Sequence, residues 1–133
     1  MASTPDSRTL CVTIARPPQK VYEFVSNPEN LPRWAAGLCK SIRKSDAGWI
    51  VEAPQGPAQI RFAEKNNFGV LDHYVTTAQG VEIYVPMRVV PNGSGSEVIF
   101  TLFRLPDMSD AKFAEDARFV EQDLRTLKNM LER

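Results

Sequence analysis

The one histidine of the chain is the side chain best suited to acid–base chemistry. His73 lies in the run Val-Leu-Asp-His-Tyr-Val at residues 70–75. If Leu71 and Val75 face the interior, the two-residue period of a strand turns His73 inward with them and turns its neighbours outward. An imidazole inside an apolar interior could orient a ligand or act as a general acid or base near neutral pH. The alternative is a histidine that bonds a backbone carbonyl or lies exposed on the outer face of a sheet.

Catalysis at His73 would need a second group that orients the ring or stabilises charge. No carboxylate occupies a position that we expect on the inner face, so His73 stays a candidate and no catalytic residue is assigned. The two cysteines, Cys11 and Cys39, have no metal-ligand spacing and no neighbouring histidine. Neither a metal site nor a cofactor is therefore expected, and two separate reduced thiols suit a cytoplasmic protein.

A strand and two short helices are predicted before the first glycine of the chain. Apolar and polar residues alternate over residues 8–14, as in a strand with one buried face. Pro17 and Pro18 suit the first turn of a helix, where the missing N–H group costs nothing. Pro28 begins a second short helix, which ends at Trp34 and is closed by Gly37.

Strand patterns and one long helix make up the rest of the chain. Six apolar segments with short turns between them predict an antiparallel meander, at residues 38–44, 49–53, 58–63, 70–76, 81–90 and 97–104. A helix follows over residues 109–132, with Ser109 or Asp110 as its N-cap. Its apolar stripe must pack on the sheet. We expect one domain over residues 1–133, with residues 1–7 disordered.

This order of elements resembles the START/Bet v 1-like (SRPBCC) superfamily, and bacterial polyketide cyclase/dehydrase-type members most closely. The resemblance covers nearly the whole chain and is strongest at residues 15–24 and 27–34, with support from the last strand and helix. It implies an α+β, helix-grip fold, in which a curved antiparallel sheet wraps around a long C-terminal helix, with two short helices after the first strand. It also implies a largely apolar cavity between sheet and helix. The family offers no single set of catalytic residues to carry over.

Alternation along the strands and the stripe of the last helix predict which side chains line that cavity. Small residues leave room there, and Ala117 lies in the middle of the helix stripe. The alternative is that these residues simply pack a core. For Trp34, the alternatives are a wall or gate of the pocket and an anchor for the two short helices. The predicted ligand-binding residues are Trp34, Trp49, Phe62, His73, Val85, Met87, Phe100, Phe113, Ala117, Val120 and Leu124.

These features predict a protein that binds a small hydrophobic or aromatic molecule. The first alternative is a polyketide cyclase or dehydratase that uses His73 as acid or base, and the second is a protein-interaction module without a ligand. The formal net charge of zero does not favour nucleic acid as a partner. No apolar run approaches the length of a membrane span, and the first residues lack the apolar stretch of a secretory signal, so we expect a cytoplasmic protein. A homodimer is left open.

Overall fold

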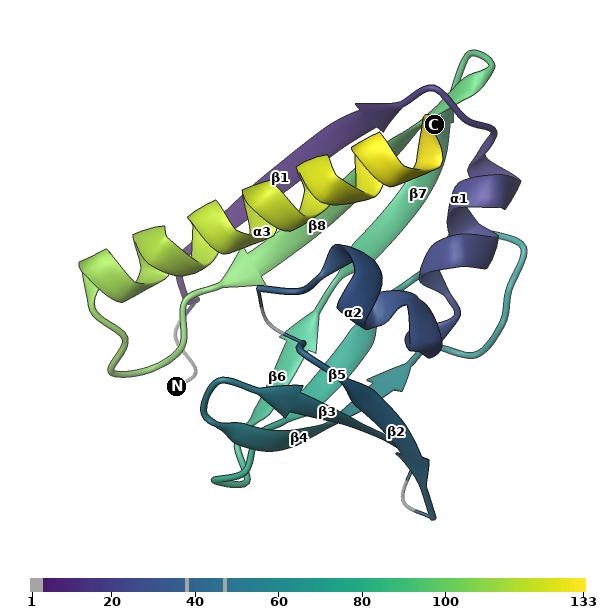
Figure 1. Cartoon of the computed structure of the whole chain (residues 1–133). Coiled ribbons are helices and arrows are strands. Elements are labelled where there is room, and N and C mark those ends of the chain that lie inside the picture. Colours follow the sequence, from purple (N-terminus) through teal and green to yellow (C-terminus); the bar gives the residue numbers. More distant parts are fainter. Residues whose placement is uncertain (1–3, 38, 47) are drawn as a thin grey trace.

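The computed structural model describes residues 4–37, 39–46 and 48–133. Curved antiparallel strands, short helices near the start and one long helix at the end give the α+β architecture that the sequence predicts (Figure 1). The elements follow in the order β1 (Ser7–Ile14), α1 (Pro18–Val25), the 3-10 helix η1 (Pro28–Asn30), α2 (Leu31–Trp34), β2 (Ile42–Ser45), β3 (Gly48–Ala53), β4 (Gly56–Phe62), β5 (His73–Thr76), β6 (Glu82–Val85), β7 (Met87–Asn92), β8 (Gly95–Phe103) and α3 (Asp110–Leu131).

The strands form two antiparallel groups that share one continuous curve. One group has the order β1-β8-β7, and the other has the order β2-β3-β4-β5-β6. The sequence predicts a single strand over residues 81–90, but Pro86 divides it into β6 and β7. Proline has no N–H group to donate to a sheet ladder, so the pairing changes there. The sequence predicts six strands after the short helices, and the structure has seven because Pro86 divides one of them.

A carboxylate holds the two groups of strands together where they meet. Asp72 accepts hydrogen bonds from the backbone N–H of Met87 (2.9 Å) and from the guanidinium of Arg88 (3.0 and 2.9 Å). Tyr84 donates its hydroxyl to the same carboxylate. The hydrogen bonds from Arg88 hold the pKa of the Asp72 carboxyl below its usual range. Because the chain turns around this carboxylate, β5 begins at His73 and not at residue 70.

The short helices after β1 form because prolines and asparagines define their ends. Pro18 stands in the first turn of α1, where no N–H group is needed. Asn27 caps η1 by accepting a hydrogen bond from the Glu29 N–H (3.1 Å). Asn30 then donates to the carbonyl of Phe24 (2.9 Å), which fixes the second helix against the first. The predicted second helix is thus a 3-10 turn that continues into α2.

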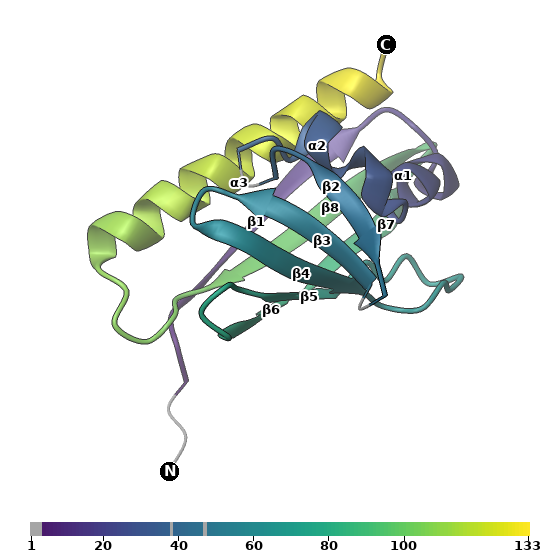
Figure 2. The same ribbon diagram turned by 60° about the horizontal axis from the view of Figure 1, so that its bottom comes forward.

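The long helix α3 lies along β1 and also packs against α2 (Figures 1 and 2). Ser109 caps its N-terminus by accepting a hydrogen bond from the Lys112 N–H (3.0 Å). Of the two residues predicted as the N-cap, Ser109 and Asp110, the structure thus uses Ser109. At the other end, Arg16 donates to the carbonyl of Leu131 (2.5 Å), and Lys128 donates to the carbonyl of Thr13 (2.7 Å). These bonds join the C-terminal end of α3 to the end of β1.

Near the start of the chain, Asp6 and Ser7 contact the end of β8 and the residue after it. Ser7 already pairs with Phe103 as the first residue of β1. The carbonyl of Asp6 accepts a hydrogen bond from the Arg104 N–H (2.8 Å), and their side chains form an ion pair (3.5 Å). The expectation of disorder over residues 1–7 stays a prediction: positions 1–3 lie outside the described residues, and Ser7 is the first residue of β1.

Candidate functional site

One face of the five-stranded group presents a continuous apolar surface toward the interior. The strand register places Trp49 opposite Ile60, Ile60 opposite Val75, and Val75 opposite Ile83. Side chains directly opposite each other in an antiparallel sheet share a face, so these four residues form one row across four strands. Lys44 continues the row on β2, where it pairs with Trp49.

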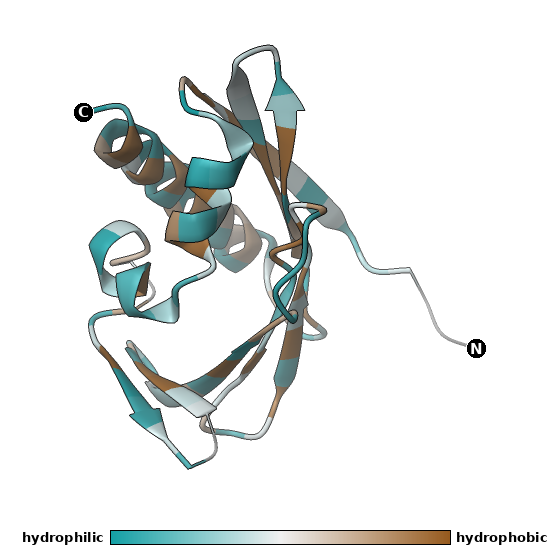
Figure 3. Cartoon of the chain, turned by 90° about the vertical axis from the view of Figure 1, so that its right-hand side faces the viewer, coloured by the Kyte–Doolittle hydropathy of each residue, from teal (hydrophilic) through white to brown (hydrophobic). Residues whose placement is uncertain are grey.

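This row is only partly covered, although it lies on the concave side. Ile60 is buried, whereas Trp49, Val75 and Ile83 keep part of their surface exposed. The arrangement of the helices explains the exposure. Helix α3 packs along β1, while the cover near β2 comes from η1 and α2 (Figure 1). Along α3 and the strands of both groups, apolar stretches alternate with polar ones (Figure 3). The concave face is therefore apolar and incompletely filled by its own helices.

His73 lies in a second row of the same face, between Phe62 and Val85. Its ring centroid lies 4.8 Å from that of Phe62 and 6.3 Å from that of Phe100, which belongs to the other group of strands. Nδ1 of His73 lies 2.9 Å from the carbonyl oxygen of Leu71. Burial among these rings lowers the pKa of His73, because the charged imidazolium loses its hydration there. The ring is therefore neutral near pH 7.

The arrangement around His73 supplies orientation but not a charged catalytic partner. The group that orients the ring is the Leu71 carbonyl, and the neighbouring carboxylate of Asp72 is engaged by Arg88 at the junction of the strand groups. A catalytic triad would instead place a carboxylate on Nδ1. The geometry of His73 thus suits hydrogen bonding to a ligand.

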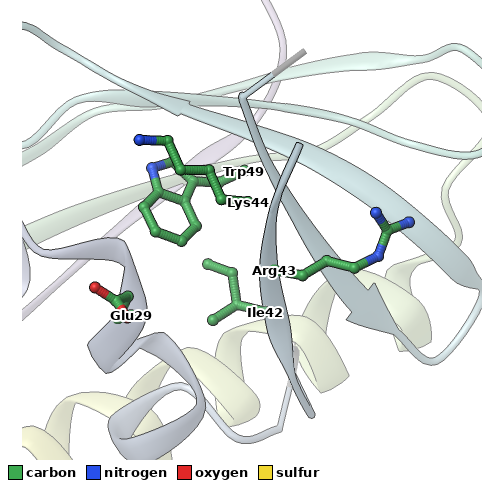
Figure 4. A pocket seen from close by; sticks show the side chains of 5 residues that line it. All are labelled: Glu29, Ile42, Arg43, Lys44 and Trp49. Carbon is green, nitrogen blue, oxygen red and sulfur yellow. The ribbon is translucent and has the colours of Figure 1, made fainter. Parts of the chain in front are cut away.

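A hollow of about 520 Å³ opens at the edge of this concave face (Figure 4). It lies between η1 and the hairpin of β2 and β3, and its lining residues are Glu29, Ile42, Arg43, Lys44 and Trp49. Figure 4 shows Ile42, Lys44 and Trp49 on the side toward Glu29, whereas the guanidinium of Arg43 points away. The ammonium of Lys44 lies 5.9 Å from the centre of the Trp49 ring. The hollow therefore combines the apolar side chains of Ile42 and Trp49 with charged groups of both signs.

Trp34 does not line this hollow but lies inside the core. Its side chain is only 4% exposed. Its indole Nε1 is buried and has no hydrogen-bond partner within residues 4–37, 39–46 and 48–133. Of the two alternatives for Trp34, its burial agrees with an anchor for the short helices, and the hollow lies instead at Glu29, Ile42 and Trp49.

The other predicted lining residues come from α3 and from the three-stranded group. Phe113, Ala117, Val120 and Leu124 are buried along one stripe of α3. Val85, Met87 and Phe100 are buried on the strands, and Met87 pairs directly with Phe100. The structure therefore places all of these side chains in the interior, and it places Trp49 and Phe62 half-buried on the concave face.

The sequence reasoning missed one buried acidic residue, Asp123 on α3. Its side chain is 7% exposed, and its carboxylate accepts a hydrogen bond from the backbone N–H of Gly37. Burial raises the pKa of the Asp123 carboxyl to about 6. A signal was present, because Asp123 follows Val120 by three positions and precedes Leu127 by four, which places it on the buried stripe.

No protein-family model matches the chain, and no curated protein sequence matches it. Solved structures do match it over nearly its whole length. Ara h 8.0201 superposes with a TM-score of 0.71 at 14% identity, over 96% of this chain and 98% of that one. A START superfamily protein from Mycobacterium smegmatis gives a TM-score of 0.70 at 12% identity, over 95% and 97%.

DynU16, described as a putative protein in the dynemicin biosynthetic locus, gives a TM-score of 0.71 at 17% identity, over 97% of this chain and 48% of DynU16. Identities this low carry information on the fold alone. The superpositions cover nearly the whole of both chains for Ara h 8.0201 and for the START superfamily protein. The chain has the START/Bet v 1-like, helix-grip fold.

Proposed function

We propose that the protein binds a small hydrophobic or aromatic molecule on the concave face of its sheet, between the sheet and α3. The observation that carries this proposal is the row Trp49, Ile60, Val75 and Ile83, which is apolar and on the inner face yet incompletely covered. A folded chain gains free energy by covering apolar surface, so a face left partly open is a natural place for an apolar ligand.

The hollow beside Glu29 supports a route to this face. Ile42 and Trp49 line the hollow, and both belong to the concave side by strand register. A ligand that enters between η1 and the β2–β3 hairpin therefore passes Glu29 and Lys44 and then reaches the apolar side chains of Ile42 and Trp49. A two-ring molecule that buries about 200 Å² of apolar surface gains about 5 kcal/mol before the cost of association. We expect dissociation constants of about 0.2 mM or weaker for simple probes.

Adding bulk to the helix side of the interior tests the proposal. Ala117 is buried in the middle of the α3 stripe. Replacing it with tryptophan should occupy the space that the ligand needs, so the fluorescence enhancement of N-phenyl-1-naphthylamine, an uncharged probe, should fall by about tenfold or more.

Ala111→Trp is the matched control, because Ala111 is an exposed residue of the same helix. It should bind the probe as the unchanged protein does. Circular dichroism and thermal melting of both variants separate loss of binding from loss of fold. Equal probe affinity in folded Ala117→Trp and Ala111→Trp proteins would refute a site between the sheet and α3.

A further inference from the structure

Two aromatic side chains inside the fold, Trp34 and His73, each carry a ring nitrogen suited to hydrogen bonding with a ligand. The first is Trp34, whose indole N–H is buried and has no acceptor within the described residues. A buried donor without a partner carries a cost in stability, and folded proteins rarely leave one unpaired. A partner from outside the chain, which offers a hydrogen-bond acceptor, would remove this cost.

The second polar atom is Nε2 of His73. The carbonyl oxygen of Leu71 can only accept a hydrogen bond, so Nδ1, 2.9 Å away, must carry the proton of the neutral ring. Nε2 then carries the lone pair and is a hydrogen-bond acceptor. The rings of Phe62 and Phe100 flank the imidazole. The inner face therefore offers one acceptor in aromatic surroundings.

We propose that Trp34 and His73 are the two polar recognition points for a neutral aromatic ligand that carries one hydrogen-bond acceptor, such as a ketone, and one donor, such as a phenolic hydroxyl. This inference rests on the proposed function, and it specifies the chemistry of the ligand. Trp34 belongs to the buried core cluster that includes Phe100, against which Phe62 packs. The donor and the acceptor thus border the same apolar interior.

The charges of the interior favour a neutral ligand over an anionic one. The buried polar or charged side chains of the described residues are His73, Ser96 and Asp123. Ser96 donates its hydroxyl to the carbonyl of Arg16 (2.6 Å), and Asp123 contributes a carboxylate. A ligand carboxylate would therefore lose its hydration without gaining a buried cation, which is strongly unfavourable.

A set of related naphthalenes tests the inference by calorimetric titration of the intact protein. The probes are naphthalene, 2-acetylnaphthalene, 2-naphthol, 6-acetyl-2-naphthol and 2-naphthoate. Each hydrogen bond should strengthen binding by roughly five- to tenfold. We expect 6-acetyl-2-naphthol to bind most tightly and 2-naphthoate to bind most weakly. The isomer 1-acetyl-2-naphthol is the matched control for the donor, because its hydroxyl donates to its own carbonyl and not to His73, and it should bind no better than 2-acetylnaphthalene.

Two substitutions assign the polar contacts. Trp34→Phe should remove the advantage of the acetyl group and keep that of the hydroxyl, and His73→Phe should do the reverse. Since Trp34→Phe could also disturb the core, the indole N–H resonance of Trp34 in the unchanged protein gives a second readout. It should move downfield with 2-acetylnaphthalene and not with naphthalene.

The two proposals fail in distinguishable ways. If all neutral probes bind equally and the indole resonance does not respond to the ketone, the polar recognition is refuted while apolar binding stands. If no probe binds, including naphthalene, the proposed function itself is refuted. If 2-naphthoate binds most tightly, the preference for a neutral ligand is wrong.

Discussion

At the scale of single residues, the interior combines apolar packing with a few polar groups whose states are set by burial. Asp123 shows this most clearly. Its carboxyl lies on the buried side of α3 and accepts a hydrogen bond from Gly37, in the segment that follows α2. A Cβ atom at Gly37 would lie 3.5 Å from the nearer carboxylate oxygen, so the backbone comes close to the acid. Burial works against the ionised form, and the pKa of about 6 reflects this.

The raised pKa of Asp123 gives a prediction for stability against pH. The folded state holds the proton up to about pH 6, whereas an aspartate in an unfolded chain releases it near pH 4. Because the folded state then binds more protons between these values, this group lowers stability as the pH rises from about 4 to about 6. Asp123→Asn keeps an acceptor for the Gly37 N–H and stays neutral. In urea denaturation at pH 7.5, the free energy of unfolding of Asp123→Asn should exceed that of the unchanged protein by about 2 kcal/mol. At pH 4 the two free energies should be equal.

Asp116→Asn on the same helix is the control for this prediction. Asp116 forms an exposed ion pair with Lys112 (2.9 Å), and its loss should cost no more than about 0.5 kcal/mol. The expectation for Asp123 is contradicted if Asp123→Asn is less stable than the unchanged protein at pH 7.5.

At the scale of elements, the chain that joins β4 to β5 runs antiparallel beside β7 and pairs with it at Val70 and Arg88. Gly69 accepts a hydrogen bond from the Val89 N–H (3.0 Å) and has a φ of +71°. A Cβ atom there would lie 2.1 Å from the Val89 carbonyl oxygen. Glycine is therefore required at this position for two reasons: the positive φ angle and the close contact between the two main chains.

The requirement at Gly69 can be measured against a second glycine. Gly69→Ala must separate the segment from β7 and should lower the free energy of unfolding by about 3 kcal/mol or more. Gly80 also has a positive φ, of +85°, but a Cβ atom there meets nothing within 4 Å. Gly80→Ala should therefore cost only about 1 kcal/mol. Chemical denaturation of both variants gives the comparison, and equal losses would contradict the role of the close contact.

The elements also show where sequence patterns stop being sufficient. Alternation predicted the strands because one face of each is buried, and the prolines predicted the short helices because proline fits a first helical turn. The break at Pro86 was missed, because the apolar residues Val85 and Met87 keep the same alternation on both sides of it. The turn around Asp72 was missed because it depends on Arg88, sixteen positions away in the sequence.

At the scale of the whole molecule, the fold could be predicted and the site only in part. The order of elements determines that a long helix closes a curved sheet, and solved structures with the same fold agree. The period within each strand suggests which residues share its inner face, but only the strand register shows that Trp49, Phe62 and His73 lie on the same face of the sheet. The sequence cannot show that Trp34 is buried without an acceptor, since that depends on every group packed around the indole. None of the helices in the described part of the chain is long and apolar enough to span a membrane.

The most direct test of the central claim is to locate a bound probe by nuclear Overhauser effects in the ¹³C-labelled protein. With N-phenyl-1-naphthylamine, we predict contacts from the probe to the methyl groups of Val75 and Ile83, which lie on the concave face. Ile50 on the opposite face of β3 is the internal reference and should show none. Contacts to Ile50 without contacts to Val75 and Ile83 would contradict binding between the sheet and α3.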